Sequence, residues 1–211
     1  MYMKGSIEKY LEDLGAKLPS PGGGSVAALT SALSAGLASM VCNFTIGNPK
    51  FPDSQTEMKG MLSSVTQIRG SLCRLVDDDV QAYAQLSAAY KLPKETDEEK
   101  LKRERVIQQA LSRAIEIPFT ILQLSYRLLE ETIRLLEKGN PGLLTDTAMA
   151  AILAYSGIES AKLNIEINLP GIKDKDIKAK LRGKIKPLIR EGRKIRDEVV
   201  KRAEKLMAKN T

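Results

Sequence analysis

A long uncharged stretch constrains the fold of this chain most. From Leu18 to Pro49 no residue carries a charge, and positions 19–25 read Pro-Ser-Pro-Gly-Gly-Gly-Ser. From Val26 to Ile46, nine of the 21 residues are Ala, Ser or Gly, which allows tight packing against other helices. Three glycines are costly to order, because glycine loses the most backbone entropy on folding. We therefore predict a glycine turn at the start of a buried central helix, whose free N–H groups favour an anion or a polar ligand.

The remaining sequence favours helices. Of 211 residues, 43% are hydrophobic but only 4% are aromatic, and few segments alternate as strands do. We predict an all-α fold in which residues 1–211 form a single-domain bundle of about seven to eight helices. Two helix starts carry a capping-box pattern, Ser54 with Glu57 and Thr96 with Glu99. Pro118 is expected to bend or restart one helix, and Pro187 to separate the last two.

Charge and cysteine content narrow the class of protein. The net charge is +7, with the excess mainly in Lys173–Lys209. This tail also holds acidic residues at helical spacing, which favours a solvated, salt-bridged face over nucleic-acid binding. Cys42 and Cys73 do not have the spacing of a disulfide framework or a zinc site, and the chain has no His. Buried free thiols in a reducing cytoplasm are the simplest interpretation.

The N-terminus and the uncharged stretch bear on targeting. Lys4, Glu8 and Lys9 are not typical of a signal peptide. The uncharged stretch is long enough to span a bilayer. It contains hydroxyl and amide side chains, however, and the other predicted helices are amphipathic. Both features favour a buried central helix. We therefore expect no membrane partner.

Four groups of polar residues could carry chemistry. They are the glycine turn, Asp79 with Tyr83 one turn later, the pairs Gly139-Asn140 and Thr145-Asp146, and Asn164 with Asn168. Asp79 could be a solvated residue or an inward-facing proton acceptor. The two pairs around residue 140 could be helix caps or ligand contacts. Asn164 and Asn168 lie at i and i+4 on an apolar helix, which indicates a polar pocket, a buried hydrogen-bonded interface or cap formation near Pro170.

Taken together and in order, these segments resemble the cyclodeaminase/cyclohydrolase family of folate one-carbon metabolism. The matching stretches are 21–28, 43–47, Asp79 with 82–83, 89–94, 139–140, 145–146 and 164–169, within a likeness that covers about residues 5–170. The chain departs from the family after Gly47, where it has Phe51 in place of a common Tyr. Thr145 also stands where Ser is common.

The resemblance implies an all-helical homodimer that acts on a tetrahydrofolate derivative. Such enzymes either close 5-formimino-tetrahydrofolate to 5,10-methenyl-tetrahydrofolate with release of ammonia, or hydrolyse the methenyl bridge to give 10-formyl-tetrahydrofolate. Asp79 and Asp146 are the expected catalytic carboxylates. One would transfer a proton or stabilise positive charge, and the other would hold the pterin, and either residue could take either role. The other expected substrate contacts are Pro21, Gly22, Gly23, Gly24, Ser25, Asn43, Tyr83, Asn140, Thr145, Asn164 and Asn168.

The anionic glutamate tail of a folate would be received by Lys50, Lys91 and Lys94 or by the positive surface. Neither a metal nor a redox cofactor is expected. Two other functions stay open: a folate-binding helical protein without activity, and a basic helical nucleic-acid-binding module. We expect the glycine turn to meet acidic and amide side chains from later segments in one cavity.

Overall fold

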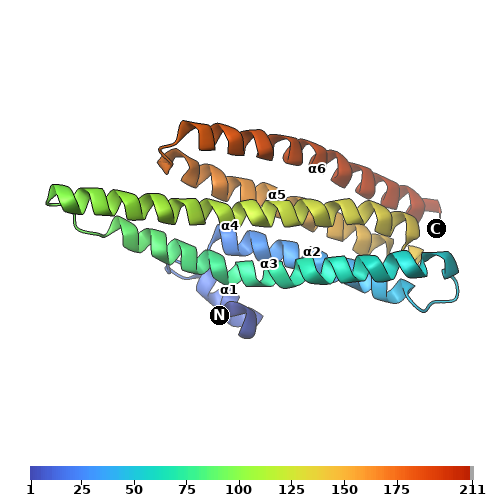
Figure 1. Ribbon diagram of the computed structural model, residues 1–211. Coiled ribbons are helices and arrows are strands. Elements are labelled where there is room, and N and C mark those ends of the chain that lie inside the picture. The colour runs from blue at the N-terminus through green and yellow to red at the C-terminus, as the bar shows by residue number, and fades with distance from the viewer. Residues whose placement is uncertain (210–211) are drawn as a thin grey trace.

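The computed structural model describes residues 1–209 and shows long helices packed side by side (Figure 1). Within these residues there is no strand, so the predicted all-α class is confirmed. The helices are α1 (Ile7–Gly15), α2 (Gly23–Thr45), α3 (Gln55–Tyr90), α4 (Asp97–Lys138), α5 (Leu144–Asn168) and α6 (Lys175–Lys209). Short 3₁₀ turns occupy Tyr2–Lys4, Pro52–Ser54, Pro141–Leu143 and Leu169–Gly171.

The described residues form six α-helices, which is fewer than the seven to eight predicted. Pro118 lies inside α4 and Pro187 inside α6, so α4 does not restart at Pro118, and the expected separation of the last two helices at Pro187 is wrong. An interior proline costs a helix about 3 kcal/mol. Each of these helices is long and packs along its length against neighbours, so tertiary contacts offset that local cost.

Helix α2 occupies the centre of the bundle, in contact with α3, α4 and α5. Its alanines at 27, 28, 35 and 38 are fully buried. The Ser34 hydroxyl donates to the Ala150 carbonyl of α5 at 2.7 Å, and the Ser31 hydroxyl lies 2.7 Å from that of Ser125 in α4. Small side chains thus allow close helix contact, and the buried hydroxyls are hydrogen-bonded, as burial demands.

Helix α2 also meets the length and apolarity of a membrane span, with a mean hydropathy of 1.6 over its best window. In this fold 61% of that window is buried inside the protein. Core helices and membrane spans share this length and apolarity, so these two properties do not by themselves place α2 in a membrane.

The N-terminal segment is attached to the side of α2 and α3. Ser6 caps α1 by accepting from the Lys9 N–H at 3.1 Å. The Tyr2 N–H donates to buried Asp77 of α3 at 2.6 Å. The Tyr10 hydroxyl lies 3.1 Å from that of Ser25, the third residue of α2. Figure 1 shows α1 projecting from the bundle on the side away from α6.

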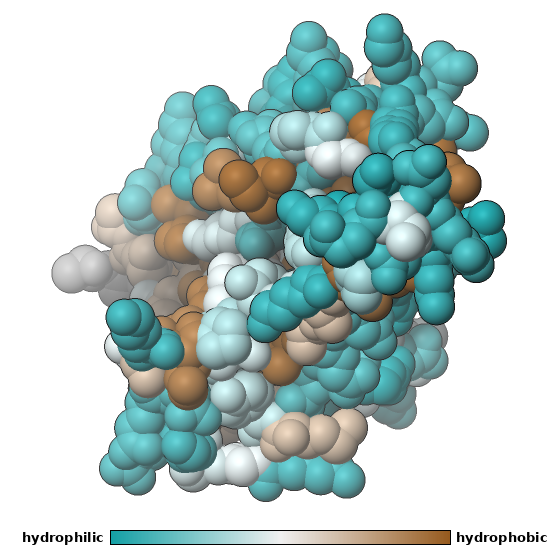
Figure 2. All heavy atoms as spheres, turned by 90° about the vertical axis from the view of Figure 1, so that its left-hand side faces the viewer, coloured by the Kyte–Doolittle hydropathy of each residue, from teal (hydrophilic) through white to brown (hydrophobic). Residues whose placement is uncertain are grey.

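The basic helix α6 packs on α5 and α4. Arg202 pairs with Glu137 at 3.1 Å and Arg193 with Glu159 at 3.4 Å. Lys173, just before α6, pairs with Glu104. Figure 2 shows that the end of the bundle with the α3–α4 and α5–α6 connections is mostly hydrophilic, with apolar groups between the polar ones. The charged tail therefore has the salt-bridged face that its sequence favoured.

Candidate functional site

A small cavity lies where α2 begins, and we call it the glycine pocket. It has a volume of about 270 Å³. Glycines at the start of α2, residues of α3 and α4, and the last turn of α5 enclose it. Its lining residues are Pro19, Ser20, Gly22, Gly23, Gly24, Asp79, Ala82, Tyr83, Leu86, Ala114, Asn164, Ile167 and Asn168.

The carboxylate of Asp79 is held directly against the N-terminus of α2. A Cβ atom added at Gly24 would overlap both Asp79 oxygens. The Ser25 backbone N–H also hydrogen-bonds to this carboxylate. Free N–H groups and the helix dipole favour negative charge at this position. Only glycine at position 24 leaves the room that this approach requires.

Burial raises the pKa of Asp79 above its ordinary value, and the Ser25 N–H opposes part of that rise. Burial also raises the pKa of Tyr10. The negative charge of Asp79 raises this pKa further, whereas the hydrogen bond from Tyr10 to Ser25 lowers it. A carboxylate that is harder to ionise is a stronger base once it is ionised. Asp79 therefore has the electrostatics of a proton acceptor.

Two amides of α5 form the opposite wall of the pocket. A Cβ atom at Gly23 would lie 3.3 Å from Asn164 Oδ1, a close contact that would move this amide by a few tenths of an ångström. The Asn164 amide donates to the Ser160 carbonyl at 2.8 Å, and the Asn168 amide to the Asn164 carbonyl at 2.9 Å. Asn164 Oδ1 thus faces the start of α2.

Asn168 has a second partner that explains part of its role. Its amide lies 3.5 Å from the Ala114 carbonyl of α4. That carbonyl is four residues before Pro118, which has no N–H to donate to it. Asn168 thus supplies a donor where the proline removed one, and this contact ties α5 to α4 at the pocket.

Most of the predicted glycine-turn residues meet at this pocket, but with different roles. Pro21 and Ser25 are buried next to it without lining it, and Ser25 faces Tyr10. Tyr83 stands at its rim with 48% of its surface exposed. Lys91 and Lys94 are exposed on the α3–α4 connection, on the same side of the bundle but farther along α3.

The other predicted site residues gather at the opposite end of α2. The Asn140 N–H donates to Thr45 Oγ1 at 2.9 Å, and its side chain donates to the Phe44 carbonyl at 3.4 Å. Thr145 and Asp146 lie in the first turn of α5 and do not cap it, since Leu143 is the N-cap. Asn43 and Lys50 are exposed at this end. We call Asn43, Asn140, Thr145 and Asp146 the distal cluster.

Within one chain the two expected carboxylates are therefore far apart. Helix α2 has 23 residues, which corresponds to a length of about 34 Å. Asp79 lies at one end of it and Asp146 at the other. The glycine turn meets Asp79 and the two asparagines, while Asp146 of the same chain stays outside the pocket.

Some structurally important residues were not indicated by the sequence. Tyr10 was one apolar position among several on an amphipathic helix. The Gln55 side chain accepts from the Gly47 N–H at 2.7 Å and donates to the Thr45 and Phe51 carbonyls, which orders the loop after α2. A glutamine next to a capping pattern carries no signal for this role.

The acidic and thiol side chains show how far metal or cysteine chemistry is available to the described residues. Among residues 1–209, no group of three or more His, Cys, Asp or Glu side chains is arranged to hold a metal ion. Cys42 is buried, and burial raises the pKa of its thiol to about 11. Cys73 is partly exposed and is also a free thiol.

Fold and pocket define an all-helical protein with a polar site at a helix N-terminus. Residues 6–187 match the family model described as Formiminotransferase-cyclodeaminase. The chain belongs to this family, as its sequence indicated.

Three relatives show the range of the family. The chain is 38% identical over 170 residues to a methenyltetrahydrofolate cyclohydrolase of Methylorubrum extorquens. This alignment covers 81% of this chain and 82% of the relative. It is 34% identical to the formimidoyltransferase-cyclodeaminase of Rattus norvegicus, covering 89% of this chain but only 35% of that longer protein. A crystal structure of formiminotetrahydrofolate cyclodeaminase from Thermotoga maritima matches with a TM-score of 0.80 at 27% identity, over 98% of this chain and 97% of the other.

Proposed function

We propose that this chain is an enzyme of folate one-carbon metabolism that hydrolyses 5,10-methenyl-tetrahydrofolate to 10-formyl-tetrahydrofolate. The observation that carries the proposal is the Asp79 carboxylate held against the N-terminus of α2, in a pocket walled by two amides. The cyclohydrolase relative, matched over most of both chains, supports this choice of reaction.

The chemistry requires one carboxylate next to a cationic carbon. The methenyl bridge is an amidinium cation, so a nearby carboxylate stabilises it and orients it. Water adds to the bridge carbon and gives its proton to Asp79, which forms a tetrahedral intermediate. The bond from this carbon to N5 then breaks as N5 takes up a proton. Methenyl-tetrahydrofolate and one water thus give 10-formyl-tetrahydrofolate and one proton.

The other pocket residues bind and orient the substrate. The N–H groups of Gly22–Gly24 and the amides of Asn164 and Asn168 offer donors and acceptors to the polar edge of a pterin ring. Tyr83 at the rim offers an aromatic face. Lys91 and Lys94 could receive the anionic glutamate tail on the same side of the bundle.

A second reaction has its own support. The structural match to formiminotetrahydrofolate cyclodeaminase covers nearly the whole of both chains. In that reaction N10 attacks the formimino carbon, and the leaving nitrogen takes up a proton and departs as ammonia. The same carbon and the same proton acceptor serve both reactions.

Assembly and location complete the proposal. We propose a homodimer that works in the cytoplasm, without a metal or redox cofactor and without a nucleic-acid or membrane partner. The chemistry above needs only proton transfer by side chains and water. The net charge of +7 favours attraction of an anionic folate.

The test follows the methenyl chromophore and ammonia separately. We expect purified protein to bleach 5,10-methenyl-tetrahydrofolate faster than the spontaneous reaction. Asp79→Asn should lower turnover ~10-fold or more, whereas Asp78→Asn, on the neighbouring residue outside the pocket lining, should stay within about twofold. Ammonia release from 5-formimino-tetrahydrofolate without bleaching would favour the second reaction. Folate binding by calorimetry without turnover of either substrate would contradict an enzyme.

A further inference from the structure

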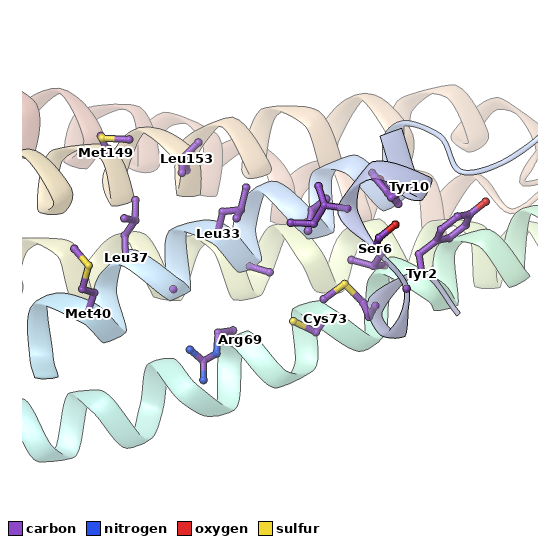
Figure 3. A pocket seen from close by; sticks show the side chains of 17 residues that line it. Tyr2, Ser6, Tyr10, Leu33, Leu37, Met40, Arg69, Cys73, Met149 and Leu153 are labelled. Carbon is purple, nitrogen blue, oxygen red and sulfur yellow. The ribbon is translucent and has the colours of Figure 1, made fainter. Parts of the chain in front are cut away.

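Tyr10 of α1 lies next to the start of α2, although it does not line the glycine pocket. It stands at one end of an apolar groove of about 680 Å³ that runs along α2, and Figure 3 shows Tyr2 beside it at that end. Tyr10 is only 4% exposed, and its hydroxyl lies 3.1 Å from that of Ser25, which is fully buried. A buried hydroxyl pair of this kind is costly to break, because water cannot replace the lost partner.

The first turn of α2 has few side-chain contacts of its own to hold it in place. Its N-cap, Gly22, makes no side-chain hydrogen bond, and Gly23 and Gly24 follow without side chains. Glycine has the greatest freedom to leave a helical conformation, and the end of a helix without a side-chain cap is less stable and frays. Ser25 is therefore the first residue of α2 whose side chain can anchor this turn.

Asp79 supplies from α3 the hydrogen-bond acceptor that the N-cap of α2 lacks. In a capped helix the N-cap side chain accepts from the N–H of the second or third helical residue. Here the Asp79 carboxylate accepts from the N–H of Ser25, the third residue of α2. In the proposed reaction the same carboxylate takes up a proton, and a neutral carboxyl group accepts more weakly than a carboxylate. Asp79 therefore loosens its hold on α2 each time it becomes protonated.

We propose that Tyr10 is a positioning residue, which holds the first turn of α2 through Ser25 and so keeps Asp79 in place against that turn in both of its protonation states. The role in turnover rests on the proposed function, whereas the anchor itself rests on the geometry alone. Burial raises the pKa of Tyr10 above its ordinary value, so its hydroxyl stays neutral at neutral pH. Its bond to Ser25 therefore persists when Asp79 gains or loses a proton.

Tyr10 is itself held in place by the segment before α1. The ring of Tyr2 meets the ring of Tyr10 edge-on, with centroids 5.3 Å apart and an angle of 88° between the planes. The Tyr2 N–H donates at 2.6 Å to Asp77, which is buried and lies two residues before Asp79 on α3. The N-terminal segment thus joins α3, at Asp77, to α2, at Ser25. It bridges the same two helices that the Asp79 carboxylate joins.

The groups around Asp79 make its titration a direct measure of this support. Helix α2 contributes N–H groups and no charge, and α4 and α5 contribute only uncharged side chains to the pocket. On α3 itself Tyr83 also lines the pocket, and from α1 Tyr10 is the titratable side chain that faces Asp79. Burial raises the pKa of Asp79, and the Ser25 N–H lowers it. A looser first turn of α2 therefore leaves the pKa of Asp79 higher still.

The anchor is tested in Tyr10→Phe, which keeps the ring and removes the hydroxyl. By amide hydrogen exchange, the Ser25 N–H should exchange at least ~5-fold faster than in the wild type. By NMR, the Asp79 carboxyl should titrate at higher pH than in the wild type, because its bond from Ser25 is weakened. Neither readout depends on turnover, so both decide on the anchor even if the proposed function fails. Unchanged exchange or an unchanged titration would overturn the proposal.

Tyr155→Phe is the matched control. Tyr155 is 3% exposed, and its hydroxyl donates to Glu159 at 2.9 Å and accepts from Arg193 of α6 at 3.1 Å. The control should lower resistance to urea as Tyr10→Phe does, because both variants remove a hydrogen-bonded hydroxyl from a buried ring. Exchange at Ser25 and the titration of Asp79 should stay as in the wild type. The same shift of Asp79 in both variants would overturn the specific role of Tyr10.

The role in turnover is tested by the pH profile of Tyr10→Phe. We expect kcat to fall ~5-fold or more with KM within about twofold, and the acid limb of kcat/KM to move to higher pH. Ser25→Ala should give a similar loss, and the double variant should lose no more than either single variant, because the two hydroxyls act as one unit. Losses that multiply in the double variant, or wild-type kinetics of Tyr10→Phe, would overturn the positioning role.

Discussion

Gly24 is the residue on which the position of Asp79 depends. A Cβ atom there would overlap both carboxylate oxygens, so Gly24→Ala must push Asp79 away from the start of α2. We predict that kcat/KM falls ~10-fold or more, because the proton acceptor leaves its place. Alanine is the better helix former, so unfolding should change by less than about 2 kcal/mol.

The matched control for Gly24→Ala is Gly60→Ala on α3, where an added Cβ atom meets nothing within 4 Å. It should leave kcat/KM unchanged and stabilise the chain by about 0.5–1 kcal/mol. Steady-state kinetics and urea denaturation measure both variants. Wild-type kinetics for Gly24→Ala would mean that the position of Asp79 is not needed for turnover.

Asp79 also predicts a pH dependence of stability. Burial raises its pKa in the folded state above that in the unfolded state. The folded state therefore binds more protons, and its stability falls as the pH rises through the interval between the two pKa values. Asp79→Asn removes this dependence. The free energy of unfolding of the variant, relative to wild type, should rise from acid to neutral pH.

Urea denaturation of wild type and Asp79→Asn at several pH values measures that difference, and Asp78→Asn serves as control. If Asp79 is the proton acceptor, turnover by the wild type should also decline in acid as its carboxylate becomes protonated. The same difference at all pH values would contradict the raised pKa.

At the residue scale, the sequence predicted part of the site for a physical reason. Glycine runs, a carboxylate inside a helix and paired asparagines are each costly, so their presence indicated close approach and polar contact. Gly24, Asp79 and Asn164 indeed meet. Tyr10 and Ala114 carry no such cost, and only their place in the fold brings them to the pocket.

At the scale of the element, Pro118 and Asn168 form a testable pair. Pro118 leaves the Ala114 carbonyl without its helical donor, and the Asn168 amide lies 3.5 Å from that oxygen. Asn168→Ala should destabilise the wild type by about 1 kcal/mol. In a Pro118→Ala background the backbone N–H of residue 118 satisfies that carbonyl, so the same change should cost less.

A double-mutant cycle from urea denaturation of these variants measures the coupling. Ser112→Ala, whose hydroxyl bonds only to its own helix at Gln108, provides an uncoupled control on α4. Equal costs of Asn168→Ala in both backgrounds would mean that the Asn168–Ala114 contact contributes nothing.

Helix caps show why local patterns predict some element boundaries and not others. The Thr96–Glu99 box forms as its pattern predicts. The equivalent Ser54–Glu57 pattern does not, because Ser54 ends a 3₁₀ turn and Glu57 pairs with Arg134 of α4 at 3.0 Å. In the second case the Glu57 side chain pairs with Arg134 of another helix and not with the backbone at Ser54. Tertiary packing likewise keeps α4 and α6 continuous through their prolines.

At the scale of the whole molecule, sequence patterns could not say which end of the bundle a motif would occupy. Asp79 and Asp146 lie on different helices, and either could have met the glycine turn. Their separation follows from the direction of α5, which places Asn164 beside Gly23 and Asn140 beside Thr45. That direction is set by contacts between residues more than 90 positions apart, which no local pattern contains.

Helices α2 and α5 pack against each other between the two ends of the bundle. A substitution at Gly157 tests how much this packing contributes to stability. A Cβ atom at Gly157 would overlap the Ser31 hydroxyl and lie 3.1 Å from that of Ser125. Gly157→Ala should therefore separate α2 from α5 and destabilise the chain by about 1–3 kcal/mol. Ser31→Ala removes the obstructing oxygen, so the double variant should lose less stability than the sum of the single changes.

Gly183→Ala is the control, because an added Cβ atom there meets nothing within 4 Å, and it should not destabilise the chain. If residues 1–211 fold as one domain, every variant should unfold in a single urea transition seen alike by circular dichroism and tyrosine fluorescence. Additive losses, or two separate transitions, would mean that α2 does not couple the bundle into one unit.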